Sequence, residues 1–309
     1  MPPVSPSRPA TEASGATTHE LDGELVDGEL ATGGGLRRRL RSSSPLVATF
    51  VMMPRIEIVE MAAASGFDAV VLDLEHGAVS VEELPQLCAA GSSAGIMTLA
   101  RLATGGESEI ARALDMGVDG IIVPHVSSPA IAAQVAAAGR FPPSGSRSLN
   151  PYVRGLRYGR QRSGALAEAD ARTALVVMIE GADAVGAIDE IGDVPGIDAL
   201  FVGPVDLAGT LGFPGEPERP EVVALVREVL GELRRRGVPS AIYAPDAGAA
   251  GRWLAEGASL VVVSADHAMV MDAFSSLRRE IARFEPHASS APGTLARTAG
   301  DRRAVPPRA

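Results

Sequence analysis

The sequence predicts an α/β fold in the form of a (β/α)8 TIM barrel, and three observations support this prediction. Eight short runs of β-branched and apolar residues alternate with longer stretches, rich in Ala, Leu, Glu and Arg, that have helical periodicity. The runs are continuously apolar, which is typical of strands buried on both faces, and the helices between them imply parallel pairing. Eight such units in about 250 residues match the size of this barrel.

The expected strands follow one another in chain order. They are VATFV (47–51), AVVLDL (69–74), IMTLAR (96–101), GIIVPHV (120–126), ALVVMIE (174–180), ALFVG (199–203), PSAIYA (239–244) and SLVVVSA (259–265). Glycines stand shortly before several strands, where a helix must end and turn back, namely Gly66, Gly95, Gly117, Gly196, Gly237 and Gly257. A six-stranded doubly wound sheet is the alternative fold, and the absence of a G-x-G-x-x-G turn after any strand argues against it.

The two ends of the chain differ in composition from the part between them. Residues 1–35 are rich in Pro, Ser, Thr, Gly and acidic side chains, and residues 286–309 are rich in Pro, Ala and Arg. Such segments contain too little apolar surface to offset the entropy of ordering, so we expect two disordered tails around one barrel domain at 36–285. We expect neither a signal peptide nor a membrane span, because the start lacks a cationic segment followed by an apolar one and the apolar runs are short.

Composition excludes several classes of chemistry. All 28 basic residues are arginine, so Schiff-base catalysis, pyridoxal-phosphate anchoring and a Walker P-loop, which need a lysine amine, are excluded. A net charge of −10 argues against binding of nucleic acid. The single cysteine, Cys88, excludes an intramolecular disulfide framework and a Cys-rich metal site, and it favours a reducing, cytoplasmic location.

Charged side chains follow the carboxyl ends of the expected strands, where barrel enzymes place their reacting groups. Glu180 follows the apolar run VVMI, and a carboxylate in such surroundings needs a cation. Glu180 and Asp206 follow adjacent strands, so their oxygens are expected to share one divalent ion whose other positions stay open to water and substrate. The alternative is an ion pair between Glu180 and either Arg101 or Arg147.

Other strand ends carry candidate acid–base and anion-binding groups. His76 stands three residues after Asp73, a spacing that suits a general base oriented by a carboxylate, although a structural histidine is the alternative. Arg101 keeps its proton and therefore suits a developing oxyanion. The segment Gly203-Pro204-Val205-Asp206 is expected to open a short helix whose N–H groups bind a substrate carboxylate, and simple turn residues are the alternative.

Two connections, 141–164 and 203–221, are longer than is usual in α/β units. Long connections of a barrel commonly hold the substrate, so we expect Arg147, in the first of them, to bind it. Surface decoration is the alternative.

Several of these segments, in this order and spacing, resemble the class II pyruvate-dependent aldolases of the HpcH/HpaI aldolase/citrate lyase family. The likeness covers about residues 36–284 and is carried by GFDAVVLDLEHG (66–77), LAR (99–101), GIIVPHV (120–126), RFPPSGSRS (140–148), VVMIEG (176–181) and GIDALFVGPVDLAGTLGFPGEPERPEV (196–222). The resemblance implies a TIM barrel of the phosphoenolpyruvate/pyruvate-binding type. It also implies a homo-oligomer, commonly a hexamer, in which the last helix is exchanged between partners.

The resemblance also implies roles for individual residues. Glu180 and Asp206 look like ligands of Mg²⁺, Mn²⁺ or Co²⁺, and His76 with Asp73 looks like the acid–base pair. Arg101 looks like the enolate-stabilising arginine, and Glu75 like an outer-shell group on metal-bound water.

The chain departs from the family pattern at three places. Met178 stands where the family usually has Gln, Gly145-Ser146-Arg147-Ser148 replaces the usual GxRG, and His125 replaces a residue that is commonly apolar.

The function implied by the resemblance is a metal-dependent carbon–carbon lyase. It would cleave or form 4-hydroxy-2-oxo acids through a pyruvate enolate, with a 2-oxo acid and an aldehyde as small-molecule partners. The alternatives are a lyase of the citrate-lyase β-subunit type that uses a CoA thioester, a biosynthetic enzyme that uses the same enolate for decarboxylation or carbon–carbon bond formation, and a non-catalytic ligand-binding barrel.

Overall fold

The computed structural model describes residues 35–160 and 163–284. Of the described residues, those up to Asp266 form one compact unit and those from His267 to Phe284 belong to a second. The predicted tails, 1–35 and 286–309, lie outside the described residues except for Gly35, and the predicted domain boundary at 285 stays a prediction.

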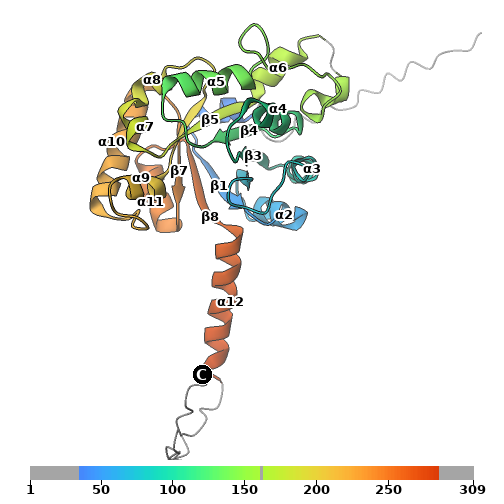
Figure 1. The fold of residues 1–309 in the computed structure, drawn as a ribbon. Helices are drawn as coiled ribbons and strands as arrows, with labels where there is room; N and C mark the ends of the chain where they lie inside the picture. The colour runs from blue at the N-terminus through green and yellow to red at the C-terminus, as the bar shows by residue number, and fades with distance from the viewer. Residues whose placement is uncertain (1–34, 161–162, 285–309) are drawn as a thin grey trace, which may run out of the picture. The chain divides into compact units, whose positions relative to one another are not determined.

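The first unit is a closed barrel of eight parallel strands that pair in chain order (Figure 1). The strands are β1 (Leu46–Val51), β2 (Ala69–Asp73), β3 (Met97–Arg101), β4 (Gly120–Val123), β5 (Ala174–Ile179), β6 (Ala199–Val202), β7 (Ser240–Ala244) and β8 (Leu260–Ala265). The predicted fold class is therefore confirmed. Strand β4 ends at Val123 rather than at residue 126, because Pro124 has no N–H for the ladder and His125 has a positive φ of 58°.

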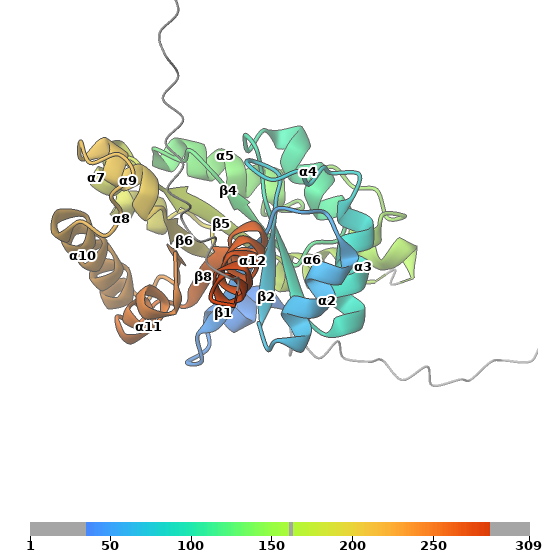
Figure 2. The same ribbon diagram turned by 90° about the horizontal axis from the view of Figure 1, so that it is seen from below.

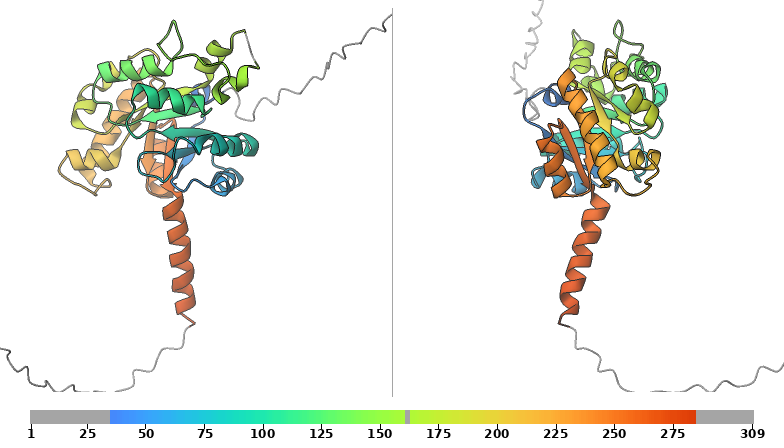
Figure 3. Two further views of the ribbon diagram at one scale, coloured as in Figure 1. Left: turned by 45° about the vertical axis from the view of Figure 1, so that its right-hand side comes forward. Right: turned by 90° about the vertical axis from the view of Figure 1, so that its left-hand side faces the viewer.

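Helices follow the strands and surround the barrel (Figure 2 and Figure 3). Those of the first unit are α1 (Leu36–Leu40), α2 (Ile56–Ala64), α3 (Leu84–Ala94), α4 (Glu107–Asp115), α5 (Pro129–Gly139), α6 (Ala165–Arg172), α7 (Ala182–Gly186), α8 (Ile188–Gly192), α9 (Pro204–Thr210), α10 (Pro220–Arg236) and α11 (Ala247–Ala255), with a 3-10 segment η1 (Arg154–Gly159). Gly95 and Gly237 end α3 and α10 in the left-handed conformation, with φ of 75° and 69°, as the sequence predicts.

Helix α12 (Asp266–Ala282) makes up most of the described part of the second unit. Among the described residues, no helix has both the length and the apolar character that spanning a membrane requires.

The core has an inner and an outer layer. Side chains such as Val71, Leu99 and Phe201 fill the barrel, together with Leu36 and Leu40 of α1, which are almost completely buried. The outer layer lies between the strands and the helices around them. Helix α1 therefore contributes to the interior of the barrel although its sequence, LRRRL, is mostly charged.

A buried ionic cluster centred on Asp198 joins α1 to the start of β6. The Asp198 carboxylate is fully buried and accepts hydrogen bonds from Arg37 Nε at 2.7 Å, from Arg41 Nη1 at 3.2 Å and from the buried guanidinium of Arg140. It also accepts the backbone N–H of Leu175 at 2.9 Å. These contacts tie together four parts of the chain, at residues 37–41, 140, 175 and 198.

We predict that Asp198→Ala lowers the free energy of unfolding by about 3–5 kcal/mol, because it leaves the buried guanidinium of Arg140 without its counter-charge. Chemical denaturation measures the change. Asp193→Ala is the matched control, since Asp193 pairs with Arg236 at 2.6 Å with 72% of its side chain exposed. The control should stay close to the wild type, and an equally small effect at Asp198 would contradict the structural role of the cluster.

Burial controls the reactivity of the single cysteine. Cys88 lies on α3 with 1% of its surface exposed, and burial raises the pKa of its thiol to about 11, while Thr98 Oγ1 at 3.7 Å opposes this rise. Because the thiolate is the reactive form, we predict that the native protein resists iodoacetamide at pH 8 and reacts fully once it is unfolded in denaturant. Mass spectrometry of the two samples checks this prediction, and rapid alkylation of the native protein would contradict it.

Candidate active site

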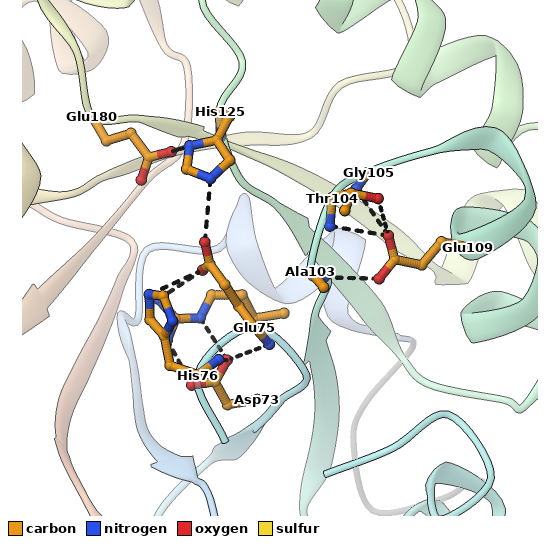
Figure 4. Close-up of polar contacts among 10 residues, drawn as sticks. Asp73, Glu75, His76, Ala103, Thr104, Gly105, Glu109, His125 and Glu180 are labelled. Carbon is orange, nitrogen blue, oxygen red and sulfur yellow. Dashed lines mark hydrogen bonds and ion pairs between the residues drawn. The ribbon is translucent and has the colours of Figure 1, made fainter. Parts of the chain in front are cut away.

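The polar side chains of the candidate site follow the carboxyl ends of β2, β3, β4 and β5. Figure 4 shows that Glu75 lies between His76 and His125, and that His125 lies between Glu75 and Glu180. Four neighbouring strands therefore bring together residues that are up to 107 positions apart in the sequence, from Asp73 to Glu180.

Asp73 and Arg101 form the buried base of this site. They are register partners on β2 and β3, and the guanidinium meets the fully buried carboxylate through Nε–Oδ1 at 2.8 Å and Nη2–Oδ2 at 2.6 Å. Arg101 Cζ also lies 4.5 Å from the centre of the Phe50 ring. A two-point pair with stacking fixes the planar guanidinium in one orientation.

The structure corrects the predicted role of Asp73. Its Oδ1 accepts the backbone N–H groups of Glu75 at 3.1 Å and His76 at 3.4 Å, and within the described residues no hydrogen bond or ion pair joins it to the His76 ring. The Asp73 carboxylate therefore orients Arg101 and the backbone of the turn after β2. The reason is register, since Arg101 lies directly opposite Asp73 on the next strand.

Glu75 links the arginine to both histidines. Its side chain is 10% exposed, with Oε2 3.3 Å from Arg101 Nη1 and 3.9 Å from His76 Nε2, and Oε1 3.4 Å from His125 Nε2. Burial raises the pKa of Glu75, Arg101 and the two histidines oppose that rise, and the nearby Glu180 carboxylate adds to it. The imidazole of His76 is 67% exposed, so the base that the sequence predicts faces solvent rather than the core.

Glu180 follows β5 and is largely covered, with 12% of its side chain exposed. Its Oε1 lies 2.6 Å from the backbone N of His125 and 2.8 Å from His125 Nδ1. The predicted alternative, an ion pair with Arg101 or Arg147, is wrong, because Arg101 pairs with Asp73 and Glu75 and Arg147 pairs with Asp115. Over the ranges that the structure describes, no arginine pairs with Glu180.

Glycine at position 203 leaves room beside Glu180. A Cβ built on Gly203 would lie 3.1 Å from Glu180 Cβ and 3.7 Å from Glu180 Oε2, and it would also lie 3.6 Å from Met178 Cε. A larger residue at 203 would therefore press on Glu180. Met178 is 3% exposed and stands opposite Phe201 in the register, so an apolar thioether lies where the family usually has an amide.

Asp206 lies in the first turn of α9 and is exposed. The structure shows no contact between Asp206 and Glu180, and among residues 35–160 and 163–284 no three His, Cys, Asp or Glu side chains are gathered as a metal site. The pairing of these two residues as ligands stays a prediction.

The predicted anion-binding segment, Gly203 to Asp206, offers fewer available N–H groups than the sequence indicates. The N–H of Gly203 donates to the Ile179 carbonyl at 3.1 Å, and Pro204 has no N–H. The backbone N–H groups of Val205 and Asp206 donate to no other described group, so these two are available in this segment.

Arg147 does not lie at this end of the barrel. Its Nη2 is 2.6 Å from Asp115 Oδ1 at the end of α4, its Cζ stacks 4.5 Å from the Phe141 ring centre, and it is 5% exposed. Arg147 lies between α5 and α6, ahead of β5, so it belongs to the amino ends of the strands. The predicted substrate-binding role of Arg147 is therefore wrong, because length alone does not tell which end of a barrel a connection occupies. The other long connection, 203–221, follows β6 and does begin at the carboxyl end.

His125 is a strand-end residue whose position between Glu75 and Glu180 the sequence does not predict. Its place near the end of the expected strand 120–126, like that of Glu180 at the end of 174–180, is the signal that points to it.

A parallel eight-stranded barrel with carboxylates, histidines and an arginine at the carboxyl ends of its strands defines the (β/α)8-barrel enzymes. The chain belongs to the HpcH/HpaI aldolase/citrate lyase family, whose model matches residues 47–273. This membership confirms the resemblance found in the sequence and makes the chain a carbon–carbon lyase by class.

Individual relatives agree with this assignment. The chain is 35% identical over 235 residues to a pyruvate aldolase of Rhizobium etli, which covers 76% of this chain and 92% of the relative. It is 31% identical over 241 residues to a hydroxypyruvate/pyruvate aldolase of Sagittula stellata, covering 78% and 95%. Among solved structures, a HpcH/HpaI aldolase/citrate lyase family protein from Burkholderia cenocepacia matches with a TM-score of 0.76 and 30% identity, over 80% of this chain and 98% of that one. Citrate synthase SbnG matches with a TM-score of 0.73 and 28% identity, over 81% and 98%.

Proposed function

We propose that this lyase is a metal-dependent aldolase that cleaves or forms 4-hydroxy-2-oxo acids through the enolate of pyruvate. The observation that carries the proposal is Glu180, a largely covered carboxylate at a strand end that pairs with no arginine in the described chain. The relatives named pyruvate aldolase and hydroxypyruvate/pyruvate aldolase support the substrate class.

The donor set at this end of the barrel suits a hard divalent cation. Glu180 and Asp206 offer carboxylate oxygens from consecutive βα units, and Gly203 leaves space beside the Glu180 side chain. Bound there, a cation such as Mg²⁺, Mn²⁺ or Co²⁺ would supply positive charge opposite the keto and carboxylate oxygens of the substrate.

The side chains of Arg101 and His76 are assigned to the remaining steps. Arg101, held by Asp73 and stacked on Phe50, presents a fixed positive charge to the negative charge that develops on the keto oxygen. In cleavage, the exposed imidazole of His76 takes the proton of the C4 hydroxyl, and the C3–C4 bond breaks. Protonation at C3 then gives pyruvate and an aldehyde.

Two further groups are assigned to holding the substrate and water. The N–H groups of Val205 and Asp206 at the start of α9 are available to the substrate carboxylate. Glu75, between Arg101 and both histidines, is assigned to orienting a water molecule beside the cation.

A second candidate function is carbon–carbon bond formation or decarboxylation with the same enolate. The similarity to citrate synthase SbnG, at 28% identity, favours it, because the name of that protein denotes a bond-forming reaction. Met178 beside Glu180 and Gly203 also favours it, since a thioether cannot donate the hydrogen bond of an amide to a substrate.

Incubating the enzyme with pyruvate and a panel of aldehydes, with Mg²⁺, Mn²⁺ and Co²⁺ in turn, tests the proposal. We expect 4-hydroxy-2-oxo acids to form with at least one aldehyde and only with a divalent ion. Turnover of oxaloacetate without any aldol product would favour the second candidate, and turnover of neither would favour a ligand-binding barrel.

We also propose a homo-oligomer, a hexamer by resemblance, in the cytoplasm. Helix α12 supports the homo-oligomer, because its apolar side chains Met271, Phe274 and Leu277 are 58–66% exposed, and exposed apolar clusters mark protein interfaces.

We predict that Phe274→Glu shifts the molecular mass measured by light scattering toward the monomer, whereas Ser276→Glu on the same helix does not. A monomeric wild-type protein would contradict the prediction.

A further inference from the structure

His125 has a backbone conformation that is unusual for its residue type. Its φ of 58° is left-handed, and among the described residues only Arg157, Tyr158 and Ser264 share a positive φ without being glycine. Of these four residues, His125 is the one that lies against the candidate metal ligand, since its N–H donates to Glu180 Oε1 at 2.6 Å. Strained residues that are held by a second group at a strand end are characteristic of functional sites.

The same backbone conformation aims the imidazole at two carboxylates. Nδ1 lies 2.8 Å from Glu180 Oε1, and Nε2 lies 3.4 Å from Glu75 Oε1 (Figure 4). The two carboxylates are 12% and 10% exposed, whereas the imidazole itself is 69% exposed. The ring therefore covers the solvent side of the two acidic groups, and its nitrogens face them.

The separation of Nδ1 and Oε1 suits two ligands of one ion. Two donors about 2.1 Å from a cation, at right angles to each other, lie about 3.0 Å apart. The observed 2.8 Å is close to this edge of an octahedron.

We propose that His125 is a nitrogen ligand of the cation held by Glu180, and that it shifts the preference of this site from Mg²⁺ toward a transition ion such as Co²⁺. The inference rests on the proposed metal-dependent function. Mg²⁺ takes oxygen ligands almost exclusively, whereas imidazole binds the later divalent ions of the first transition row more tightly. A ring nitrogen beside the Glu180 carboxylate would therefore discriminate between ions that carboxylates alone treat more evenly.

Two measurements on the full chain test the proposal. The first is the electron spin echo of Mn²⁺ bound to the protein, with histidine labelled with ¹⁵N, because a directly bound imidazole couples its nitrogen to the electron spin. The second is the affinity for Co²⁺ and for Mg²⁺ by equilibrium titration. Neither readout depends on turnover.

The variant is His125→Asn. Asn tolerates a left-handed φ, and its amide still hydrogen-bonds to Glu180, so the change removes the ring nitrogen and keeps the contact. His76→Ala is the matched control, because the His76 ring approaches its nearest carboxylate only to 3.9 Å.

We expect nitrogen coupling in the wild type and in His76→Ala, and none in His125→Asn. We expect the Co²⁺ affinity of His125→Asn to fall by roughly tenfold or more, which is at least the loss that removal of an outer-shell partner causes. Its Mg²⁺ affinity should change by less than about threefold, since Mg²⁺ does not rely on a nitrogen ligand.

Two results would overturn the inference in different ways. If the wild type binds Mn²⁺ without nitrogen coupling and His125→Asn keeps the ratio of Co²⁺ to Mg²⁺ affinity, His125 only positions Glu180 and the proposed aldolase function stands. If the wild type binds none of the three ions, the metal requirement of the proposed function fails together with the ligand.

Discussion

His76→Ala should lose aldol cleavage by roughly two to four orders of magnitude, which is the usual contribution of a positioned acid–base group. Decarboxylation of oxaloacetate should survive substantially in the same variant, because it requires a charge sink for the enolate but no deprotonation of a hydroxyl. The exposed imidazole, 67% accessible, supports a role toward substrate rather than in the core, so the fold should be unaffected.

Steady-state rates of both reactions, measured with the metal content of each sample, separate the possible roles of His76. If both activities fall together with metal content, His76 is a ligand or a structural residue. If neither activity changes, His76 is not the base, and His125, which contacts Glu75 and Glu180, becomes the candidate.

Asp206→Ala should abolish both retention of the divalent ion and exchange of the pyruvate methyl protons, because a single carboxylate is a poor site for a hard dication. Asp206 is exposed on α9, so its removal should leave the melting temperature unchanged. Asp183→Ala is the matched control, since Asp183 is an exposed acidic residue in the first turn of α7, the helix that follows β5.

Metal content by elemental analysis and exchange by NMR check this prediction. The control should keep both properties. An Asp206→Ala enzyme that retains its metal and exchanges at the wild-type rate would remove Asp206 from the site.

The strands were predictable because parallel barrel strands are buried on both faces. A run such as AVVLDL has no polar face, and the structure has β2 over Ala69–Asp73 within the predicted 69–74. The ends of strands were less predictable where backbone chemistry intervenes, as at Pro124 and His125 after β4.

The residues at the carboxyl ends of the strands were predictable, but the ion pairs among them were not. Chain order places Asp73, Arg101 and Glu180 at strand ends, because every parallel strand ends on the same side of the barrel. Which groups meet depends on strand register and side-chain conformation, neither of which a single sequence contains. Asp73 and His76 are close in sequence, yet the Asp73 carboxylate pairs with Arg101, which lies on the neighbouring strand.

Chain order alone could have shown at which end of the barrel Arg147 lies. Its loop follows helix α5 and leads through α6 to β5, which places it at the amino ends of the strands, where Asp115 pairs with it. The pairing of Arg37, Arg41 and Arg140 with the buried Asp198 was not predictable from a sequence that shows only a run of arginines.

Hydrogen exchange at the methyl group of pyruvate tests the central claim, metal-dependent enolate formation at the carboxyl end of this barrel, most directly. The measurement is the loss of the pyruvate methyl signal in deuterated water, recorded by NMR with enzyme stripped by a chelator and then reloaded. We predict no enzymatic exchange in the stripped protein, recovery on addition of Mg²⁺, Mn²⁺ or Co²⁺, and no recovery in Glu180→Ala. Exchange at full rate in the stripped wild-type protein, or in Glu180→Ala, would contradict the claim.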